Sequence, residues 1–251
     1  MSYKIIGHRG NKSEYTENTI AGFQSILDTE GIDGFECDVV VSQDKKLVIS
    51  HDYYIEDKNQ NKQMLYDLTY DEILQIEKGK IVNTPKNTFK YPLLEDLLLI
   101  CSQSNKTKKI LIEIKSIPST SLPLSIKKII SQVHSLLKTY NLVHSVYIIS
   151  FDSRIIEESR KQNKDIKTGF ICHRNLFPLS CIINTLQPSL IIIEKDWITK
   201  QQVKEITKKD IELFIWTANT KEDWLRLIDS GVNGIITDLP NELKYHKLHN
   251  P

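Results

Sequence analysis

Short apolar segments rich in isoleucine and valine recur along the whole chain, and helical patterns separate them. The segments that predict strands are 3–8, 34–41, 46–51, 109–115, 145–151, 166–171, 190–194, 211–217 and 234–237. The segments that predict helices include 18–29, 93–101, 124–140, 153–162, 199–208 and 221–230. Alternation of this kind is typical of βα units built around a parallel sheet.

One connection does not fit that pattern. Only residues 42–45 separate strand 34–41 from strand 46–51, whereas parallel neighbours need a crossover of about a dozen residues or more. We therefore expect segment 46–51 to form a hairpin with the strand before it. Eight parallel strands then remain, and a chain of about 250 residues is the usual size of a (β/α)₈ TIM barrel. An open doubly wound sheet is the alternative.

The domain organisation predicted from this pattern is a single domain over residues 1–251. A polar stretch at about 52–91 is too long for an ordinary βα loop, and it contains a short helical pattern over Tyr70–Glu77. We expect a small insertion there, after the second barrel strand. The tail Tyr245–Pro251 is expected to be frayed.

Composition excludes several classes of function. The 33 basic residues nearly balance the 32 acidic ones, for a net charge of +1, so strong non-specific binding to nucleic acid or anionic membranes is not expected. No apolar run approaches the roughly 20 residues of a transmembrane helix. The first residues enter a strand pattern without a signal-peptide core, which favours a cytoplasmic protein. The lysine-rich stretches Lys106–Lys109 and Lys204–Lys209 are expected to be solvated, and the oligomeric state stays open.

The four cysteines are scattered and show no CxxC spacing. They are typical of reduced thiols in a cytoplasmic chain. A zinc site at Cys172, His173 and Cys181 is an alternative, but it lacks a fourth ligand at the usual spacing.

Acidic residues occur near the ends of two predicted strands, where barrel enzymes carry their catalytic groups. Glu36 and Asp38 are two residues apart, so both side chains point to one face of the strand. Glu113 and Lys115 repeat this spacing on the next barrel strand. Three carboxylates together suit a hard divalent cation, Mg²⁺ or Ca²⁺. Plain ion pairs, Glu113 with Lys115 and Glu36 with Arg9, are the structural alternative.

Two histidines are expected to reach the same place. His8 ends the first strand, and His51 ends the hairpin. A two-residue turn at Gln43–Asp44 would place His51 opposite Glu36. A turn one residue later would place His51 opposite Asp38. A three-residue loop would instead turn the His51 side chain to the face of the sheet away from the acids. Two histidines beside carboxylates favour a general acid and a general base, although core histidines at strand ends are the alternative.

The local charge points to a phosphate substrate. Three carboxylates and one divalent cation sum to −1, and Arg9 with Lys115 brings the site to +1. That charge suits a phosphodiester monoanion, which an arginine can bind with two parallel hydrogen bonds. Phe151 and Trp216, at later strand ends, are candidates for an apolar wall beside the alcohol group; ordinary core packing is the alternative.

The same residues resemble a known family, the glycerophosphodiester phosphodiesterases. The similar motifs run in order from residue 4 to about 240, and they cover nearly the whole chain. They are Ile6–Gly10, Glu17–Thr19, Gly34–Val39, His51–Asp52, Glu113–Lys115, Ser150–Phe151, Trp216–Asn219 and Gly234–Asp238. Any one motif is weak evidence, but the ordered set is highly specific.

The resemblance implies a (β/α)₈ barrel that hydrolyses glycerophosphodiesters to glycerol 3-phosphate and an alcohol with the help of a metal. By matching position, the metal ligands would be Glu36, Asp38 and Glu113. His8 and His51 would be the acid–base pair, with Arg9 and Lys115 holding the phosphate.

The chain also departs from the family's pattern. Thr16 stands where proline is frequent, and Cys37 replaces an aliphatic residue. Glu56–Lys58 stands where an Arg-Thr-Thr pattern is common, which leaves the alcohol group open. Rival interpretations are a lysophospholipase D, an enzyme similar to phosphatidylinositol-specific phospholipase C, and a non-catalytic barrel that binds a phosphate ligand.

Overall fold

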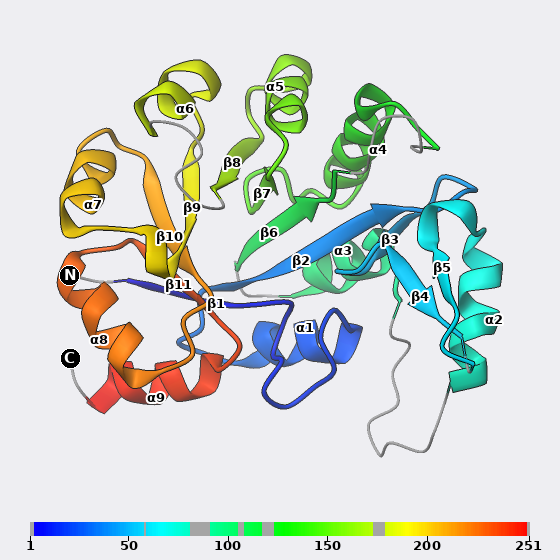
Figure 1. Cartoon of the computed structure of the whole chain (residues 1–251), viewed down its shortest axis with the longest axis horizontal. Coiled ribbons are helices and arrows are strands. Elements are labelled where there is room, and N and C mark those ends of the chain that lie inside the picture. Colours follow the sequence, from blue (N-terminus) through cyan, green and yellow to red (C-terminus); the bar gives the residue numbers. More distant parts are fainter. Residues whose placement is uncertain are drawn as a thin grey trace.

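Eight parallel strands close into a barrel in the computed structural model (Figure 1). It describes residues 3–57, 59–80, 91–104, 108–116, 123–172 and 179–249, with the backbone alone at 77–80. The barrel strands are β1 (Lys4–Gly7), β2 (Gly34–Val41), β6 (Lys109–Ile114), β7 (Val146–Ser150), β8 (Lys167–Cys172), β9 (Leu190–Glu194), β10 (Glu212–Trp216) and β11 (Gly234–Thr237). Neighbours pair in parallel around the ring, and the β1–β2 pairing closes it. The predicted (β/α)₈ barrel is confirmed, and the open sheet is excluded.

Helices surround the barrel (Figure 1). They are α1 (Ile20–Asp28), α3 (Leu94–Gln103), α4 (Ile126–Thr139), α5 (Ser153–Gln162), α6 (Leu179–Leu186), α7 (Lys200–Thr207), α8 (Lys221–Ser230) and α9 (Pro240–His249), with a 3₁₀ turn, η2, at Lys195–Trp197. Side-chain caps fix several starts: Thr19, Thr199 and Thr220 each accept a hydrogen bond from a backbone N–H in the first turn. The helix ends predicted from the sequence agree with those in the structure to within about two residues, because the sequence carries these caps.

The C-terminal residues differ from the prediction of a frayed tail. Helix α9 continues to His249 and buries Leu243 and His246. The ammonium of Lys247 donates to the carbonyl of Tyr3 at 2.5 Å. Buried side chains and this contact stabilise the helix against the start of the chain. Residues 250–251 lie outside the described residues.

The predicted hairpin is present, and its register decides the length of its turn. β3 (Leu47–Ile49) runs antiparallel to β2 with Val41 opposite Leu47. Ser42 N–H donates to the carbonyl of Lys46 at 3.0 Å, so three residues form the loop, with Lys45 in the left-handed region at φ 68°. Of the alternatives that the sequence left open, the three-residue loop is the one present. In this register His51 lines up with Cys37, which faces away from Glu36 and Asp38.

Residues between β3 and α3 form a small layer of their own. It contains a two-stranded hairpin of β4 (Tyr54–Glu56) and β5 (Lys62–Met64), then η1 (Leu65–Asp67) and α2 (Tyr70–Lys80). The apolar side chains of this layer pack with Val40 and Val48 of the β2–β3 hairpin. Helix α2 includes the short helix predicted over Tyr70–Glu77. Residues 81–90, the rest of the predicted insertion, lie outside the described residues.

Two apolar regions hold the barrel together. The larger lies between the strands and the helices. The smaller fills the barrel interior with side chains at every second position of the strands, among them Ile6, Leu111, Ile149, Ile192, Phe214 and Ile236. Charged side chains lie above and below this interior layer on the same strands. The layer therefore separates two polar ends of the barrel.

The lysines at the start of β6 are not the solvated face that the sequence predicted. Lys108 is buried, and its ammonium donates to the carbonyls of Thr29, at 2.7 Å, and Ile32. Lys109 is half-buried at the end of the barrel where the strands begin, which we call the lower end. Its ammonium contacts Glu212 there. Alternate residues of a barrel strand point inward, which encloses Lys109, whereas Lys108 is enclosed by the connection between α1 and β2. None of the described helices has the length and apolar character needed to cross a membrane.

Candidate active site

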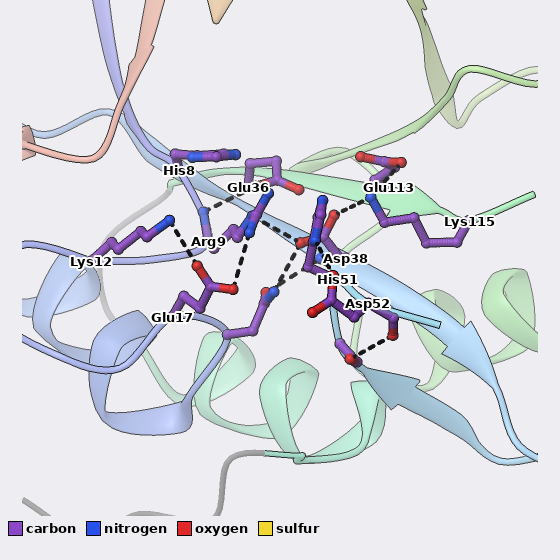
Figure 2. Close-up of polar contacts among 12 residues, drawn as sticks. His8, Arg9, Lys12, Glu17, Glu36, Asp38, His51, Asp52, Glu113 and Lys115 are labelled. Carbon is purple, nitrogen blue, oxygen red and sulfur yellow. Dashed lines mark hydrogen bonds and ion pairs between the residues drawn. The ribbon is translucent and has the colours of Figure 1, made fainter. Parts of the chain in front are cut away.

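Three buried carboxylates meet at the carboxyl ends of β2 and β6 (Figure 2). Glu36 and Asp38 point to the same side of β2, and Asp38 is the direct register partner of Glu113 on β6. One oxygen from each of the three side chains lies within 4.8 Å of the others. The spacing of two along a strand and the parallel register between strands together place them here.

Two cations lie against these acids (Figure 2). The Lys115 ammonium is 2.8 Å from Asp38 Oδ1 and 2.8 Å from Glu113 Oε1. The Arg9 backbone N–H donates to Glu36 Oε2 at 3.0 Å, and its guanidinium Nε is 3.4 Å from Asp38 Oδ2. The Glu113–Lys115 pair of the structural alternative is therefore present, but Lys115 also pairs with Asp38, and Arg9 contacts Glu36 through its backbone N–H.

The pKa values show that two cations do not satisfy three acids. Burial raises the pKa of Asp38, but Lys115 and Arg9 outweigh it and hold that pKa at about 2. Burial, followed by the charge of Asp38, raises the pKa of Glu36 well above its ordinary value. Burial also raises the pKa of Glu113 to about 7, against the opposing effect of Lys115. The site thus favours a further positive charge.

The loop after β1 holds Arg9 in an unusual backbone conformation. Arg9 and Gly10 have φ values of 55° and 87°, and a left-handed residue such as Gly10 is best served by glycine. Asn18, at φ 56°, donates its backbone N–H to the Arg9 carbonyl at 2.9 Å and its side-chain amide to Asp38 Oδ2 at 2.8 Å. The turn thus directs the Arg9 side chain toward the acids.

Both predicted histidines line the same pocket as the acids. His8 follows β1 directly. His51 arrives differently from the prediction: the chain leaves the hairpin ladder after Ser50, whose N–H donates to the Asp38 carbonyl at 3.0 Å. The loop after Ser50 then brings the His51 imidazole to the pocket, although the hairpin register alone would direct this side chain away from the acids. Burial, followed by the charge of Lys115, lowers the pKa of His51.

The far side of the pocket is apolar. Phe151 and Trp216 make an edge-to-face contact with ring centroids 5.8 Å apart. The remaining lining is isoleucine from the later strands, at positions 149, 171, 192 and 236. All the residues predicted from sequence for this site therefore line one pocket: His8, Arg9, Glu36, Asp38, His51, Glu113, Lys115, Phe151 and Trp216.

Several polar residues of the site escaped the sequence reasoning. Glu17 accepts from Arg9 at 3.0 Å and from Lys12 at 2.8 Å. Asp238, the last residue of the Gly234–Asp238 motif, lies 2.7 Å from Nδ1 of His8, and the sequence assigned it no role. The available signal was barrel closure, which makes the last strand a neighbour of the first. The described residues contain no other cluster of three or more possible metal ligands.

Comparison with known proteins identifies the family. The family model described as glycerophosphoryl diester phosphodiesterase family matches residues 8–242. The chain belongs to this family. The predicted family, and with it the prediction that the chain is an enzyme of phosphodiester hydrolysis, is confirmed.

Individual relatives span nearly the whole chain. It is 29% identical to a glycerophosphodiester phosphodiesterase of Caldanaerobacter subterraneus, over 97% of each protein. It is 26% identical to the human lysophospholipase D GDPD1, covering 98% of this chain and 86% of that protein. A solved phosphodiesterase of Oleispira antarctica, in complex with the product sn-glycerol-3-phosphate, has the same fold, with a TM-score of 0.79 at 20% identity over 96% and 95% of the two chains.

Proposed function

We propose that this protein hydrolyses glycerophosphodiesters to sn-glycerol 3-phosphate and an alcohol in a metal-dependent reaction. The observation that carries the proposal is one pocket lined by three buried acids, two cations and two histidines. Family membership supports the substrate class. The Oleispira phosphodiesterase, with sn-glycerol-3-phosphate as its product, supports the identity of the product.

The acids fit a divalent cation by the chemistry of their donor atoms. Glu36, Asp38 and Glu113 offer only carboxylate oxygens, which Mg²⁺ and Ca²⁺ prefer. Burial of like charges raises the pKa of Glu36 and Glu113, so a bound cation would relieve their repulsion. A divalent cation supplies Lewis-acid polarisation of phosphate oxygens and orients the nucleophile.

Arg9 and Lys115 are the proposed phosphate ligands. The predicted site charge of +1 needs one correction, because Glu17 adds a fourth acid beside Arg9. Lys12 pairs with Glu17 at 2.8 Å and offsets its charge. Asp238 adds one more acid beside His8, and the protonated histidine that acts as the general acid offsets it. The pocket with a cation bound therefore still suits a phosphodiester monoanion.

His8 and His51 are the proposed acid–base pair. One removes a proton from the nucleophile, which is water or the glycerol hydroxyl, and the other protonates the oxygen of the departing alcohol. Nδ1 of each ring lies beside an aspartate, Asp238 for His8 and Asp52 for His51. The contact at Nδ1 leaves Nε2 of His8 available for proton transfer.

Phe151 and Trp216 are the proposed apolar wall for the alcohol or glycerol portion of the substrate. A second candidate activity, lysophospholipase D, is favoured by the apolar half of this pocket and by the human relative of that name. Both activities hydrolyse a phosphodiester of glycerol, so the site chemistry is shared.

We also propose that residues 52–91 are an insertion within one catalytic domain and that Tyr53, near its start, borders the pocket. In the part of the insertion that the structure describes, Tyr53 donates its hydroxyl to the Ser116 carbonyl at 3.0 Å. Ser116 directly follows Lys115, so this contact ties the insertion to the phosphate-binding side of the site.

Release of glycerol 3-phosphate from glycerophosphocholine, glycerophosphoethanolamine and glycerophosphoinositol tests the proposal, with release of lysophosphatidic acid from a lysophosphatidylcholine measured beside it. We expect turnover that EDTA abolishes and that Mg²⁺ or Ca²⁺ restores. His8→Ala and His51→Ala should each lower kcat by about 10²-fold or more, with thermal unfolding as the control for folding. Release of a free alcohol and lysophosphatidic acid would favour the second candidate. Full activity in excess EDTA contradicts the metal requirement.

A further inference from the structure

The two pocket histidines have aspartate partners in unequal surroundings. His8 Nδ1 lies 2.7 Å from Asp238 Oδ1, and His51 Nδ1 lies 2.9 Å from Asp52 Oδ1. The side chains of His8 and Asp238 are 11% and 23% exposed, whereas those of His51 and Asp52 are 39% and 56% exposed. Water screens an exposed pair strongly and an enclosed pair weakly.

Asp238 is also held on its other side. The side-chain amide of Asn219 donates to Asp238 Oδ2 at 2.7 Å, and Asn219 Oδ1 accepts from the Asp238 backbone N–H at 2.9 Å. Lys12 places its ammonium 3.8 Å from Asp238 Oδ1. These contacts fix the carboxylate in one orientation, with Oδ1 directed at the imidazole.

The position of His8 is fixed by the barrel closure as well. Its backbone N–H donates to the Thr237 carbonyl at 2.9 Å, so the first and last strands meet directly beside the pair. Burial raises the pKa of Asp238, but the hydrogen bonds and charges of His8, Asn219 and Lys12 outweigh it and hold that pKa at about 2. It is therefore an ionised acceptor, and the His8 nitrogen facing it carries a hydrogen. Nε2 of His8 is then free to accept a proton.

We propose that Asp238 is a positioning residue for His8: it fixes the Nδ1–H tautomer and balances the imidazolium that forms during turnover, whereas Asp52 gives His51 no comparable support. The inference rests on the proposed role of His8 in catalysis. An ionised acceptor at Nδ1 is a known means of orienting a catalytic histidine in other hydrolases. Asn219 completes the unit by holding the acceptor.

The variants Asp238→Asn and Asp52→Asn form a matched pair for testing this inference. In Asp238→Asn the Asn219 amide selects the carbonyl oxygen of the new side chain. The new amide group then faces His8 and favours the wrong tautomer. We expect kcat to fall by at least about 10²-fold with KM changed by less than about threefold. Asp52→Asn should retain kcat to within about threefold. Equal kcat values for the two variants would overturn the inference.

The tautomer itself can be observed without substrate. Long-range ¹H–¹⁵N correlation spectra, with His8 assigned through His8→Ala, should show a neutral Nδ1–H ring in the wild-type protein and an Nε2–H ring in Asp238→Asn. An Nε2–H ring in the wild-type protein would overturn the inference even if a variant fails to fold. Absence of phosphodiesterase activity in the wild-type protein would instead refute the proposed function, which separates the two failures.

Discussion

The two ends of the barrel carry charged side chains on the same strands, yet the charges are arranged in opposite ways. The upper end, where the strands end, holds the acids Glu36, Asp38 and Glu113 together with the cations Arg9 and Lys115. The lower end holds what we call the lower cluster: Lys4, Lys109, Tyr147, Lys167 and Glu212. The apolar interior layer lies between them. The strand period of two produces both ends, because every second residue points inward.

In the lower cluster the acid is fully paired. Glu212 accepts from the Tyr147 hydroxyl at 2.6 Å, from Lys109 at 3.2 Å and from Lys4. Burial raises the pKa of Glu212, but its hydrogen bonds with Lys4 and Tyr147 and the charge of Lys109 outweigh that effect and lower it overall. The carboxylate needs no further ligand.

In the upper cluster the acids outnumber their cations, and the pKa values of Glu36 and Glu113 are raised for that reason as well as by burial. The comparison shows that charge inside a barrel is not by itself a mark of function. An unsatisfied set of like charges at the carboxyl ends of the strands indicates a ligand site. At the amino ends, the pairing of the one acid of the lower cluster, Glu212, with Lys4 and Lys109 is typical of a stabilising contact.

The largest expected effect is on activity, which a substitution at the upper end should lower and a substitution at the lower end should not. Asp38→Asn removes a proposed metal ligand and should lower kcat/KM by about 10³-fold or more, since several kcal/mol of charge stabilisation depend on the cation. Glu212→Gln makes the same acid-to-amide change at a partly buried carboxylate of the other end and should keep kcat/KM within about threefold. Glycerol 3-phosphate release measures both. A similar loss in the two variants would contradict the division between the ends.

The second prediction compares the free energies of unfolding of variants at the two ends. Here the variant at the lower end should show the larger loss. Glu212→Gln leaves Lys4 and Lys109 without their charged acceptor and should lower the free energy of unfolding by about 1–3 kcal/mol. Glu36→Gln, without added metal, removes a repelled buried charge and should leave that free energy unchanged or raise it. Urea unfolding in EDTA gives both values. Destabilisation by Glu36→Gln larger than that by Glu212→Gln would refute the assignment of strain to the upper end.

Much of the fold and the site could be predicted because the relevant signals are local. Eight strands followed from the alternation and from the four-residue connection after Val41. The proximity of Glu36 and Asp38 followed from their spacing, and that of Glu113 from its place on the next parallel strand. These inferences need only the geometry of a strand and its neighbour.

The errors came where the outcome depends on the assembled barrel. The partner of His8 is Asp238, which lies 230 residues away and becomes a neighbour only when the ring closes. The enclosure of Lys108 and the helix that continues past Tyr245 also depend on tertiary packing. His51 lines the pocket although the three-residue loop is the alternative that was expected to turn it away, because the chain leaves the hairpin after Ser50.

The smallest effect uses pH to sharpen the comparison. Glu212 has a lowered pKa in the folded protein, so its stabilisation is fully present above the unfolded-state pKa of about 4.3 and is lost as the pH falls through the folded-state pKa. The difference in unfolding free energy between the wild-type protein and Glu212→Gln should be constant from about pH 7 to pH 5 and should shrink below about pH 4. Urea unfolding at each pH measures it. A difference that stays constant down to about pH 3 would contradict the pairing of Glu212.

The central claim is that Glu36, Asp38 and Glu113 form a cation site. The most direct measurement is calorimetric titration of the metal-free protein with Mg²⁺ and with Ca²⁺, using Asp38→Asn as the test and Glu212→Gln as the control. We predict one site per chain in the wild-type protein and in Glu212→Gln, with binding lost or at least about 10²-fold weaker in Asp38→Asn. Equal affinity in the wild-type protein and Asp38→Asn, or no binding of either cation to the wild-type protein, would contradict the account.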